Sequence, residues 1–164
     1  LGVKTTFDDR TPGKPTTVTL TKSSNRVGRL EYDFTNAPDL AQTIVCTCCA
    51  MGLPFHFTGL QTLKIKETDR IEALKTEMRK LGIALEDRND SELLWTGPSK
   101  HNAQPSIPTT QPAIDTYEDH RMAMAFAPMS MVMPMAIRNP QVVTKSYPHF
   151  WSDLRTAGFT VLQH

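Results

Sequence analysis

Two parts of the chain repeat the same order of charged residues and expected elements, and this repetition restricts the fold more than any other feature. Asp39 and Lys66 lie 27 residues apart, and Asp119 and Lys145 lie 26 residues apart. Each interval begins with an apolar helical segment and ends where a strand-like segment precedes a second helix. Self-similarity at a fixed spacing is typical of a repeated supersecondary unit. The sequence therefore predicts two copies of one α/β unit.

The first copy is expected to have the order βαβαββ. Alternation, helical periodicity and turn residues predict a strand over 27–34, a helix over 39–52, a strand over 53–65, a helix over 67–82 and a hairpin over 83–97 that turns at 89–91. The second helix carries one apolar stripe and stops at Gly82; the stripe consists of Ile71, Leu74, Met78 and Leu81.

The same order begins again after a connector over 99–112 that is rich in proline, threonine and glutamine. The second copy is expected to contain a strand over 113–117, a helix over 119–133, a strand over 134–143, a helix over 146–158 and a strand over 159–164. Pro128 should kink or shorten its first helix. The first 22 residues read as a hairpin around 8–14 whose upstream partner is missing, so the chain is expected to be an excised part of a longer protein.

The first helix of each copy is apolar nearly all round, over 41–51 and over 122–133. A helix of this kind lies inside a protein rather than on its surface. The expected fold class is therefore α/β (α+β), built from repeated βαβαββ units with buried helices and outer sheets. Five of the eight methionines lie between Met122 and Met133, where core packing explains them better than a soft-metal site.

Composition excludes several classes of function. The 18 Lys and Arg residues against 17 Asp and Glu leave a formal charge of +1, which does not favour binding to nucleic acid or to an anionic membrane. No apolar run reaches the roughly 18 residues of a membrane span. Three cysteines, Cys46, Cys48 and Cys49, crowd one apolar run without a second ligand pair, so they predict buried free thiols, a cytoplasmic location and no metal site.

Charged residues gather where the strands are expected to lead into helices. These positions carry Lys64, Lys66 and Arg70 in the first copy and His120, Arg121 and Lys145 in the second. A helix N-terminus offers free N–H groups, and arginine adds a planar fork, so such positions suit carboxylates or phosphates.

A local explanation is also open, because Glu67 and Arg70 are three residues apart and could form an ion pair on one helix face. The equivalent positions of Asp39 and Asp119 favour a site instead, since one end of the domain would collect all these charges. His120 is expected to have a supporting role.

Four motifs, "PDLAQT", "LKIKETDRIEAL", "EDHRMAMAFAP" and "KSYPHFWSDL", closely resemble those of the 5-enolpyruvylshikimate-3-phosphate synthase family, and the resemblance runs from "LGVKTTF" to the end of the chain. It implies an inside-out α/β barrel of two domains, each with three βαβαββ units, and substrates bound between the domains. Residues 1–164 would then be part of the C-terminal domain: 1–24 the closing hairpin of one unit, 25–100 a complete unit and 111–164 a second unit. The N-terminal domain would be absent.

The resemblance also implies a reaction, the transfer of the enolpyruvyl group of phosphoenolpyruvate to the 5-hydroxyl of shikimate 3-phosphate with release of phosphate, without metal or organic cofactor. Asp39 matches the family's residue at the 5-hydroxyl and is expected to act as base. Lys66 would bind shikimate 3-phosphate and assist proton movement, and Glu67 would exchange a proton with the methylene carbon. Phosphoenolpyruvate would be held by Arg70, Arg121 and Lys145. One position departs from the pattern: Thr62 stands where some members carry asparagine.

Two alternatives stay open from the sequence. The related UDP-N-acetylglucosamine enolpyruvyl transferases share the fold and the donor, but they use a reactive cysteine from a loop, whereas the cysteines here fall in a predicted helix. The chain alone could instead be a noncatalytic folded module, because the substrate contacts of the other half are missing. The full-length protein is expected to be a monomer.

Overall fold

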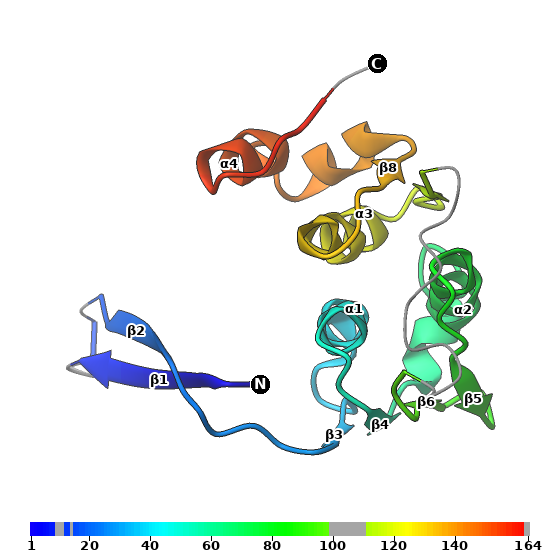
Figure 1. The fold of residues 1–164 in the computed structure, drawn as a ribbon, viewed down its shortest axis with the longest axis horizontal. Coiled ribbons are helices and arrows are strands. Elements are labelled where there is room, and N and C mark those ends of the chain that lie inside the picture. Colours follow the sequence, from blue (N-terminus) through cyan, green and yellow to red (C-terminus); the bar gives the residue numbers. More distant parts are fainter. Residues whose placement is uncertain (9–11, 14, 99–110, 163–164) are drawn as a thin grey trace.

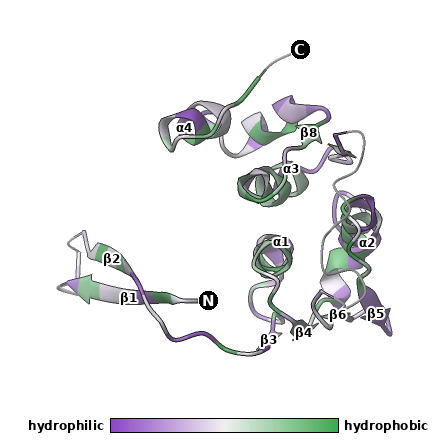
Figure 2. Ribbon diagram, viewed as in Figure 1, coloured by the Kyte–Doolittle hydropathy of each residue, from purple (hydrophilic) through white to green (hydrophobic). Residues whose placement is uncertain are grey.

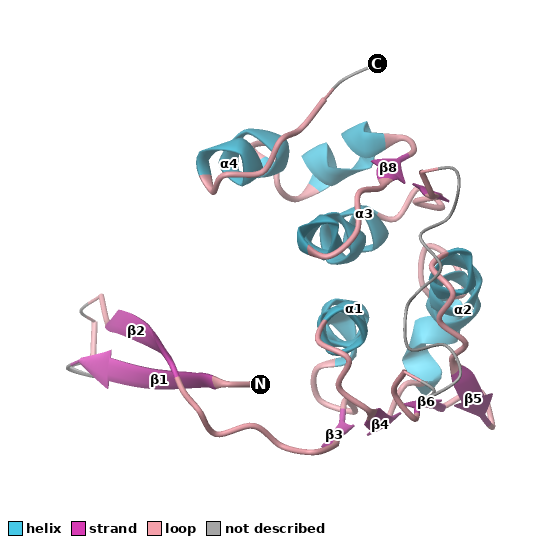
Figure 3. Ribbon diagram, in the orientation of Figure 1, coloured by secondary structure: helices cyan, strands magenta, loops and turns pink. Residues whose placement is uncertain are grey.

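The computed structural model describes residues 1–8, 12–13, 15–98 and 111–162, and most of the predicted connector lies outside this range. The strands are β1 (Val3–Asp8), β2 (Thr17–Lys22), β3 (Leu30–Asp33), β4 (Phe55–Thr58), β5 (Glu86–Arg88), β6 (Glu92–Trp95), β7 (Ala113–Ile114) and β8 (Ala136–Ile137). The α-helices are α1 (Ala41–Ala50), α2 (Arg70–Lys80), α3 (His120–Phe126) and α4 (Phe150–Thr156), and 3-10 helices are η1 (Pro38–Leu40), η2 (Gln61–Ile65), η4 (Ala127–Met131) and η5 (Pro140–Lys145). Figures 1 and 3 show that the helices and short strands alternate along the chain.

The central sheet has four strands in the order β3-β4-β6-β5. β3 and β4 are parallel, whereas β6 is antiparallel to both β4 and β5. Between β3 and β6 the elements follow the predicted order βαβαββ. The hairpin turns at Asn89 and Asp90, which have φ values of 51° and 53°. Two successive left-handed residues of this type are typical of a tight hairpin turn, and the predicted turn is confirmed.

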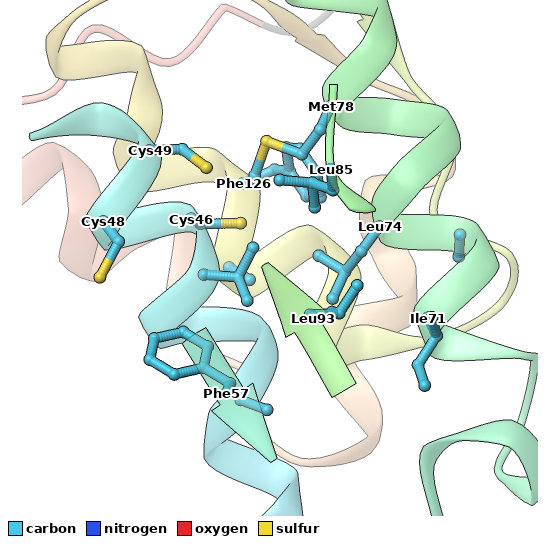
Figure 4. Packing of buried hydrophobic residues seen from close by; sticks show 14 of the residues in the cluster. Cys46, Cys48, Cys49, Phe57, Ile71, Leu74, Met78, Leu85, Leu93 and Phe126 are labelled. Atoms are coloured by element: carbon cyan, nitrogen blue, oxygen red, sulfur yellow. The ribbon is translucent and has the colours of Figure 1, made fainter. Parts of the chain in front are cut away.

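The main core lies between the sheet and the helices. In Figure 1, α1 lies between the sheet and α3, and Figure 2 shows that both helices are largely hydrophobic. Phe55 and Phe57 of β4 are fully buried and stack at 4.4 Å between ring centroids. Figure 4 shows Cys46, Leu74 and Met78 among the residues of this core. The predicted stripe of α2 is buried along its whole length, and the prediction of a buried first helix is confirmed for α1.

The hairpin of β1 and β2 stands apart from the central sheet (Figure 1). Its antiparallel register pairs Thr5 with Leu20 and Phe7 with Val18, so apolar residues gather on one face. Every residue of both strands is exposed. A hairpin is therefore present where the sequence predicts one.

No helix among the described residues is long and apolar enough to cross a membrane.

Several predicted boundaries are wrong. The strand expected over 53–65 ends at Thr58, because Gly59 turns the backbone at φ 72° and a Cβ there would overlap Asp33 and Thr35. The strand expected over 134–143 ends at Ile137, because Asn139 has a left-handed φ of 48° and Pro140 starts a 3-10 helix. No strand forms over 159–162, the described part of the last prediction.

Two helices also begin later than expected. Asp39 lies in η1 ahead of α1, since Pro38 starts this turn. Asp69 caps α2 by accepting a hydrogen bond from Glu72 N at 3.0 Å, so Glu67 precedes the helix. Pro128 has the predicted effect: α3 ends at Phe126 and the chain continues as η4.

Gln42 of α1 is fully buried, and neither its amide oxygen nor its amide nitrogen has a hydrogen-bond partner among the described residues. An unpaired buried amide is costly, whereas an apolar side chain of similar shape is not. Gln42→Met is therefore expected to raise the free energy of unfolding of the full-length protein by about 1 kcal/mol. Chemical denaturation measures the change, and a loss of stability would show that the amide is hydrogen-bonded in solution.

Candidate active site

Arg70 is the centre of a charged cluster built from both copies of the repeat. Arg70 is the first residue of α2, and its side chain is 1% exposed. Its Nε donates to Asp119 Oδ2 at 2.7 Å and its Nη2 to Asp119 Oδ1 at 3.3 Å. The other contacts are Nη1 to Asp39 Oδ1 at 2.9 Å and Nη2 to Glu67 Oε2 at 2.7 Å. Three carboxylates thus compensate one buried guanidinium.

Asp119 joins the two copies; the sequence predicts it among the gathered charges but assigns it no catalytic or substrate-binding role. Its side chain is fully buried, and besides Arg70 it accepts a hydrogen bond from Arg121 N at 2.9 Å, which caps α3. The sequence carries a signal for the cap, an aspartate directly before a helix. The ion pair with a residue 49 positions earlier has no local signal.

Asp39 meets three cations. Arg121 Nη2 donates to its Oδ2 at 3.1 Å, Arg70 to its Oδ1, and Lys66 Nζ lies 3.6 Å from the same Oδ1. Arg121 also donates from Nη1 to the Asp39 carbonyl at 3.2 Å. Burial raises the pKa of the Asp39 carboxyl, but Arg121, Lys66 and Arg70 outweigh it and hold this pKa below the ordinary value.

Glu67 is also held in its ionised form. A hydrogen bond from its own backbone N–H lowers its pKa most, and Arg70, His120 and Lys66 lower it further against partial desolvation. The predicted ion pair with Arg70 is therefore present, although Glu67 lies outside the helix. His120 thus affects Glu67 electrostatically, and its supporting role stays a prediction.

Lys145 reaches the same region from η5. Its Nζ donates to the Glu118 carbonyl at 3.4 Å, one residue before Asp119. The seven residues Asp39, Lys66, Glu67, Arg70, Asp119, Arg121 and Lys145 are thus linked by contacts, either directly or through a neighbouring residue. The predicted gathering of these charges is observed as this set of contacts, but Lys66 and Lys145 follow or end 3-10 helices rather than strands.

The cluster has a buried inner layer and an accessible outer layer. The side chains of Arg70 and Asp119 are excluded from solvent, whereas Asp39, Lys66, Glu67 and Arg121 keep between 34% and 46% of their side-chain surface exposed. The accessible layer combines two ionised carboxylates with two cations. Such a layer can bind an anionic ligand and accept a proton from it.

Lys64 has a structural role. Its Nζ bonds Asp90 at 2.7 Å and lies 3.1 Å from Asp69, and these contacts raise its pKa. The first of them ties η2 to the β5–β6 turn and the second ties it to the cap of α2. Both partners of Lys64 are carboxylates of the chain, so its contacts fix η2 in place, and its part in anion binding stays a prediction.

The three cysteines lie in α1 and are free and buried. Burial raises the pKa of all three thiols, that of Cys48 to about 11. A buried protonated thiol is a poor nucleophile and a poor metal ligand. Among the described residues, no group of three or more His, Cys, Asp or Glu side chains is arranged to hold a metal ion.

Comparisons with known proteins identify relatives of the chain. The chain is 54% identical to the 3-phosphoshikimate 1-carboxyvinyltransferase of Bacteroides fragilis over 162 residues, which cover 98% of the chain and 37% of that protein. It is 34% identical to the enzyme of the same name from Methanoculleus marisnigri over 142 residues, 86% of the chain and 31% of that protein. The chain thus spans about two fifths of the length of the first of these relatives.

Solved structures agree on the fold. The structure of EPSP synthase from Acinetobacter baumannii superposes with a TM-score of 0.75 over 97% of the chain and 37% of the solved chain, at 22% identity. This likeness confirms the predicted α/β class, although the strands of the described residues form three separate sheets and no closed barrel. The family model described as EPSP synthase (3-phosphoshikimate 1-carboxyvinyltransferase) matches residues 12–154. The chain therefore belongs to the EPSP synthase family.

Proposed function

We propose that the full-length protein transfers the enolpyruvyl group of phosphoenolpyruvate to the 5-hydroxyl of shikimate 3-phosphate and releases phosphate, a step of the shikimate pathway. The observation that carries the proposal is the contact of Asp39 with Arg121, because it joins the predicted base of one copy to the predicted anion-binding residue of the other. Both residues lie in family motifs, and the relatives named above carry the name of this reaction.

The reaction requires two proton transfers in its addition step and one from carbon in its elimination step. In the addition step, the 5-hydroxyl oxygen bonds to C2 of phosphoenolpyruvate, the hydroxyl proton leaves, and the methylene carbon gains a proton. In the elimination step, the C2–O bond to phosphate breaks and the new methyl group loses a proton, which restores the double bond. Groups that accept and donate protons must therefore lie beside the methylene carbon and the hydroxyl.

Asp39 and Glu67 suit the acceptor roles in the substrate-free state, because their lowered pKa values keep them ionised. Glu67 must also donate a proton to the methylene carbon. The negative charges of bound phosphoenolpyruvate would raise its pKa toward the range of a general acid. Lys66, next to Asp39, would bind shikimate 3-phosphate and stabilise the anion that forms when the hydroxyl loses its proton.

The guanidinium groups are already paired before a substrate binds. Four of the five N–H groups of Arg70 donate to carboxylates of the chain, and Arg121 is paired with Asp39. Phosphoenolpyruvate would therefore take the place of Asp39 at Arg121 and turn the aspartate toward the 5-hydroxyl. Lys145 would add a third cation for the departing phosphate.

Of the two alternatives from the sequence, one is less well supported and the other is kept for the chain by itself. A cysteine mechanism of the UDP-N-acetylglucosamine enolpyruvyl transferase kind disagrees with three thiols that are buried in α1 and have raised pKa values. A noncatalytic module remains the proposal for the chain by itself, because a site between two domains needs donors from both.

The remaining parts of the proposal rest on the resemblance to the family. Within a C-terminal domain, the chain would divide into 1–24, 25–100 and 111–164, and an N-terminal domain would complete the site. The full-length protein would be a monomer and would need no cofactor. A cytoplasmic location is supported by the three free, buried cysteines.

Phosphate release tests the function. The full-length protein is expected to release phosphate only when phosphoenolpyruvate and shikimate 3-phosphate are both present, and the purified 164-residue chain is expected to release none. Replacing shikimate 3-phosphate by UDP-N-acetylglucosamine is the control for the related enzyme. Turnover with the UDP-sugar alone as acceptor would refute the proposed substrate, and turnover by the short chain would refute the need for a second domain.

A further inference from the structure

Glu77 is a buried carboxylate outside the candidate site. It lies on α2 seven residues after Arg70, which places both side chains on the same face of the helix, about 10 Å apart along its axis. Its side chain is fully buried. Its Oε1 accepts from the Tyr117 hydroxyl at 2.6 Å, and its Oε2 accepts from Asp115 N at 3.0 Å. Glu77 thus binds the segment that leads from β7 to α3.

Lys80 completes this second network. Its Nζ lies 2.6 Å from Glu77 Oε2 and donates to Asp115 Oδ2 at 2.7 Å and to the Ala113 carbonyl at 3.2 Å. Helix α2 therefore holds the segment over 113–119 at two places. Arg70 holds its end through Asp119, and Glu77 with Lys80 holds its start and middle.

The held segment has an unfavourable backbone. Tyr117 and Glu118 have φ values of 54° and 56°, a left-handed region that side chains with a Cβ rarely adopt. Two such residues in a row need tertiary contacts to keep them there. Tyr117 supplies one through its hydroxyl, and the Glu118 carbonyl accepts from Lys145. Asp119, His120 and Arg121 follow immediately.

We propose that Glu77 and Tyr117 are positioning residues that fix the turn before α3 and thereby set Arg121 and Lys145 for the phosphoenolpyruvate side of the site. The proposal rests on the proposed function for its substrate. The turn leads directly to Arg121 and contacts Lys145, whereas Asp39 and Lys66 lie on other segments and Asp39 meets the turn only through Arg121. Loosening the turn should therefore affect the binding of phosphoenolpyruvate more than that of shikimate 3-phosphate.

Tyr117→Phe in the full-length protein removes the hydroxyl donor and keeps the ring. We expect the KM for phosphoenolpyruvate to rise by about tenfold, which corresponds to the free energy of one lost hydrogen bond. The KM for shikimate 3-phosphate and kcat should stay within about twofold of the parent values. Glu77→Gln retains an acceptor and should give a smaller rise than Glu77→Leu.

The matched control is Lys75→Met. Lys75 also lies on α2 and pairs with Glu72 and with Asp87 of β5, away from the turn. A purely structural effect of weakened α2 contacts would change the kinetics of Lys75→Met in the same way. An equal rise of both KM values in Tyr117→Phe, or the same selective rise in Lys75→Met, would overturn the proposal.

Amide chemical shifts of the full-length protein separate this proposal from the proposed function. Tyr117→Phe is expected to shift the backbone amides of 118–121, and Lys75→Met is expected to leave them in place. If the parent protein released no phosphate, the proposed function would fail, and these shifts would still decide whether the hydroxyl fixes the turn. Unchanged amides in Tyr117→Phe would overturn the positioning role.

Discussion

Arg70→Met is expected to lower the free energy of unfolding of the full-length protein by about 3–5 kcal/mol, the usual cost of removing one partner from a buried ion pair. Methionine fills a similar volume, so packing is largely kept. The loss is electrostatic: the fully buried Asp119 would keep the N–H of Arg121 but lose its bidentate partner, and Asp39 would lose one of its three cations. Chemical denaturation followed by tryptophan fluorescence measures the change.

Arg79→Met is the matched control, because Arg79 lies on the same helix and is exposed. A surface substitution of this kind changes stability by about 0.5 kcal/mol or less. The double variant Arg70→Met with Asp119→Leu should recover part of the loss, since no buried charge is then left unpaired. A cost for Arg70→Met no larger than that of Arg79→Met would contradict the central place of Arg70.

Glu67→Gln should lower kcat by about 10²–10⁴-fold, the range of a general acid–base group, and should change the KM of either substrate far less. The amide keeps the shape of the side chain and can still accept from Arg70, but it cannot exchange the proton of the methylene carbon. Little stability should be lost, because the Glu67 side chain is 46% exposed. Steady-state phosphate release with both substrates measures the effect.

Glu72→Gln is the control for this variant. Glu72 lies in the first turn of α2, is 56% exposed and pairs with Lys75 three residues later, so it repeats the sequence spacing of the Glu67–Arg70 pair without touching the cluster. Its kcat should match that of the parent. Equal turnover in Glu67→Gln and Glu72→Gln would exclude Glu67 from the proton transfers.

The core was predictable because the apolar residues that give a helix its periodicity are the same residues that the fold buries. The stripe of α2 and the apolar α1 are buried as the pattern indicates, and Pro128 and Gly82 act as the expected breaks. The ends of β4 and β8 were not predictable from propensity. A close approach to Asp33 decides the turn at Gly59, and such a contact is tertiary.

The candidate site was predictable as a set of positions but not as a network. Equivalent places in two copies of a repeat predicted that Asp39, Arg70 and Arg121 would meet. The sequence predicted Asp119 among these charges, but its ion pair with Arg70 was not predictable, because the helix cap already accounts for the aspartate locally. The structural contacts of Lys64 were not predictable, because its partners Asp69 and Asp90 meet it only after the chain folds. Charge along a sequence does not show which cations are already neutralised.

The central claim is that side chains from both copies of the repeat bind one pair of substrates, and a crystal structure tests it most directly. The crystals would contain the full-length Glu67→Gln protein, whose slow turnover preserves both substrates. The predicted result has the phosphoenolpyruvate anions within hydrogen-bond distance of Arg121 and Lys145, and the Asp39 carboxylate released from Arg121 and facing the 5-hydroxyl. Phosphoenolpyruvate bound elsewhere, with the pair of Asp39 and Arg121 intact, would contradict the account.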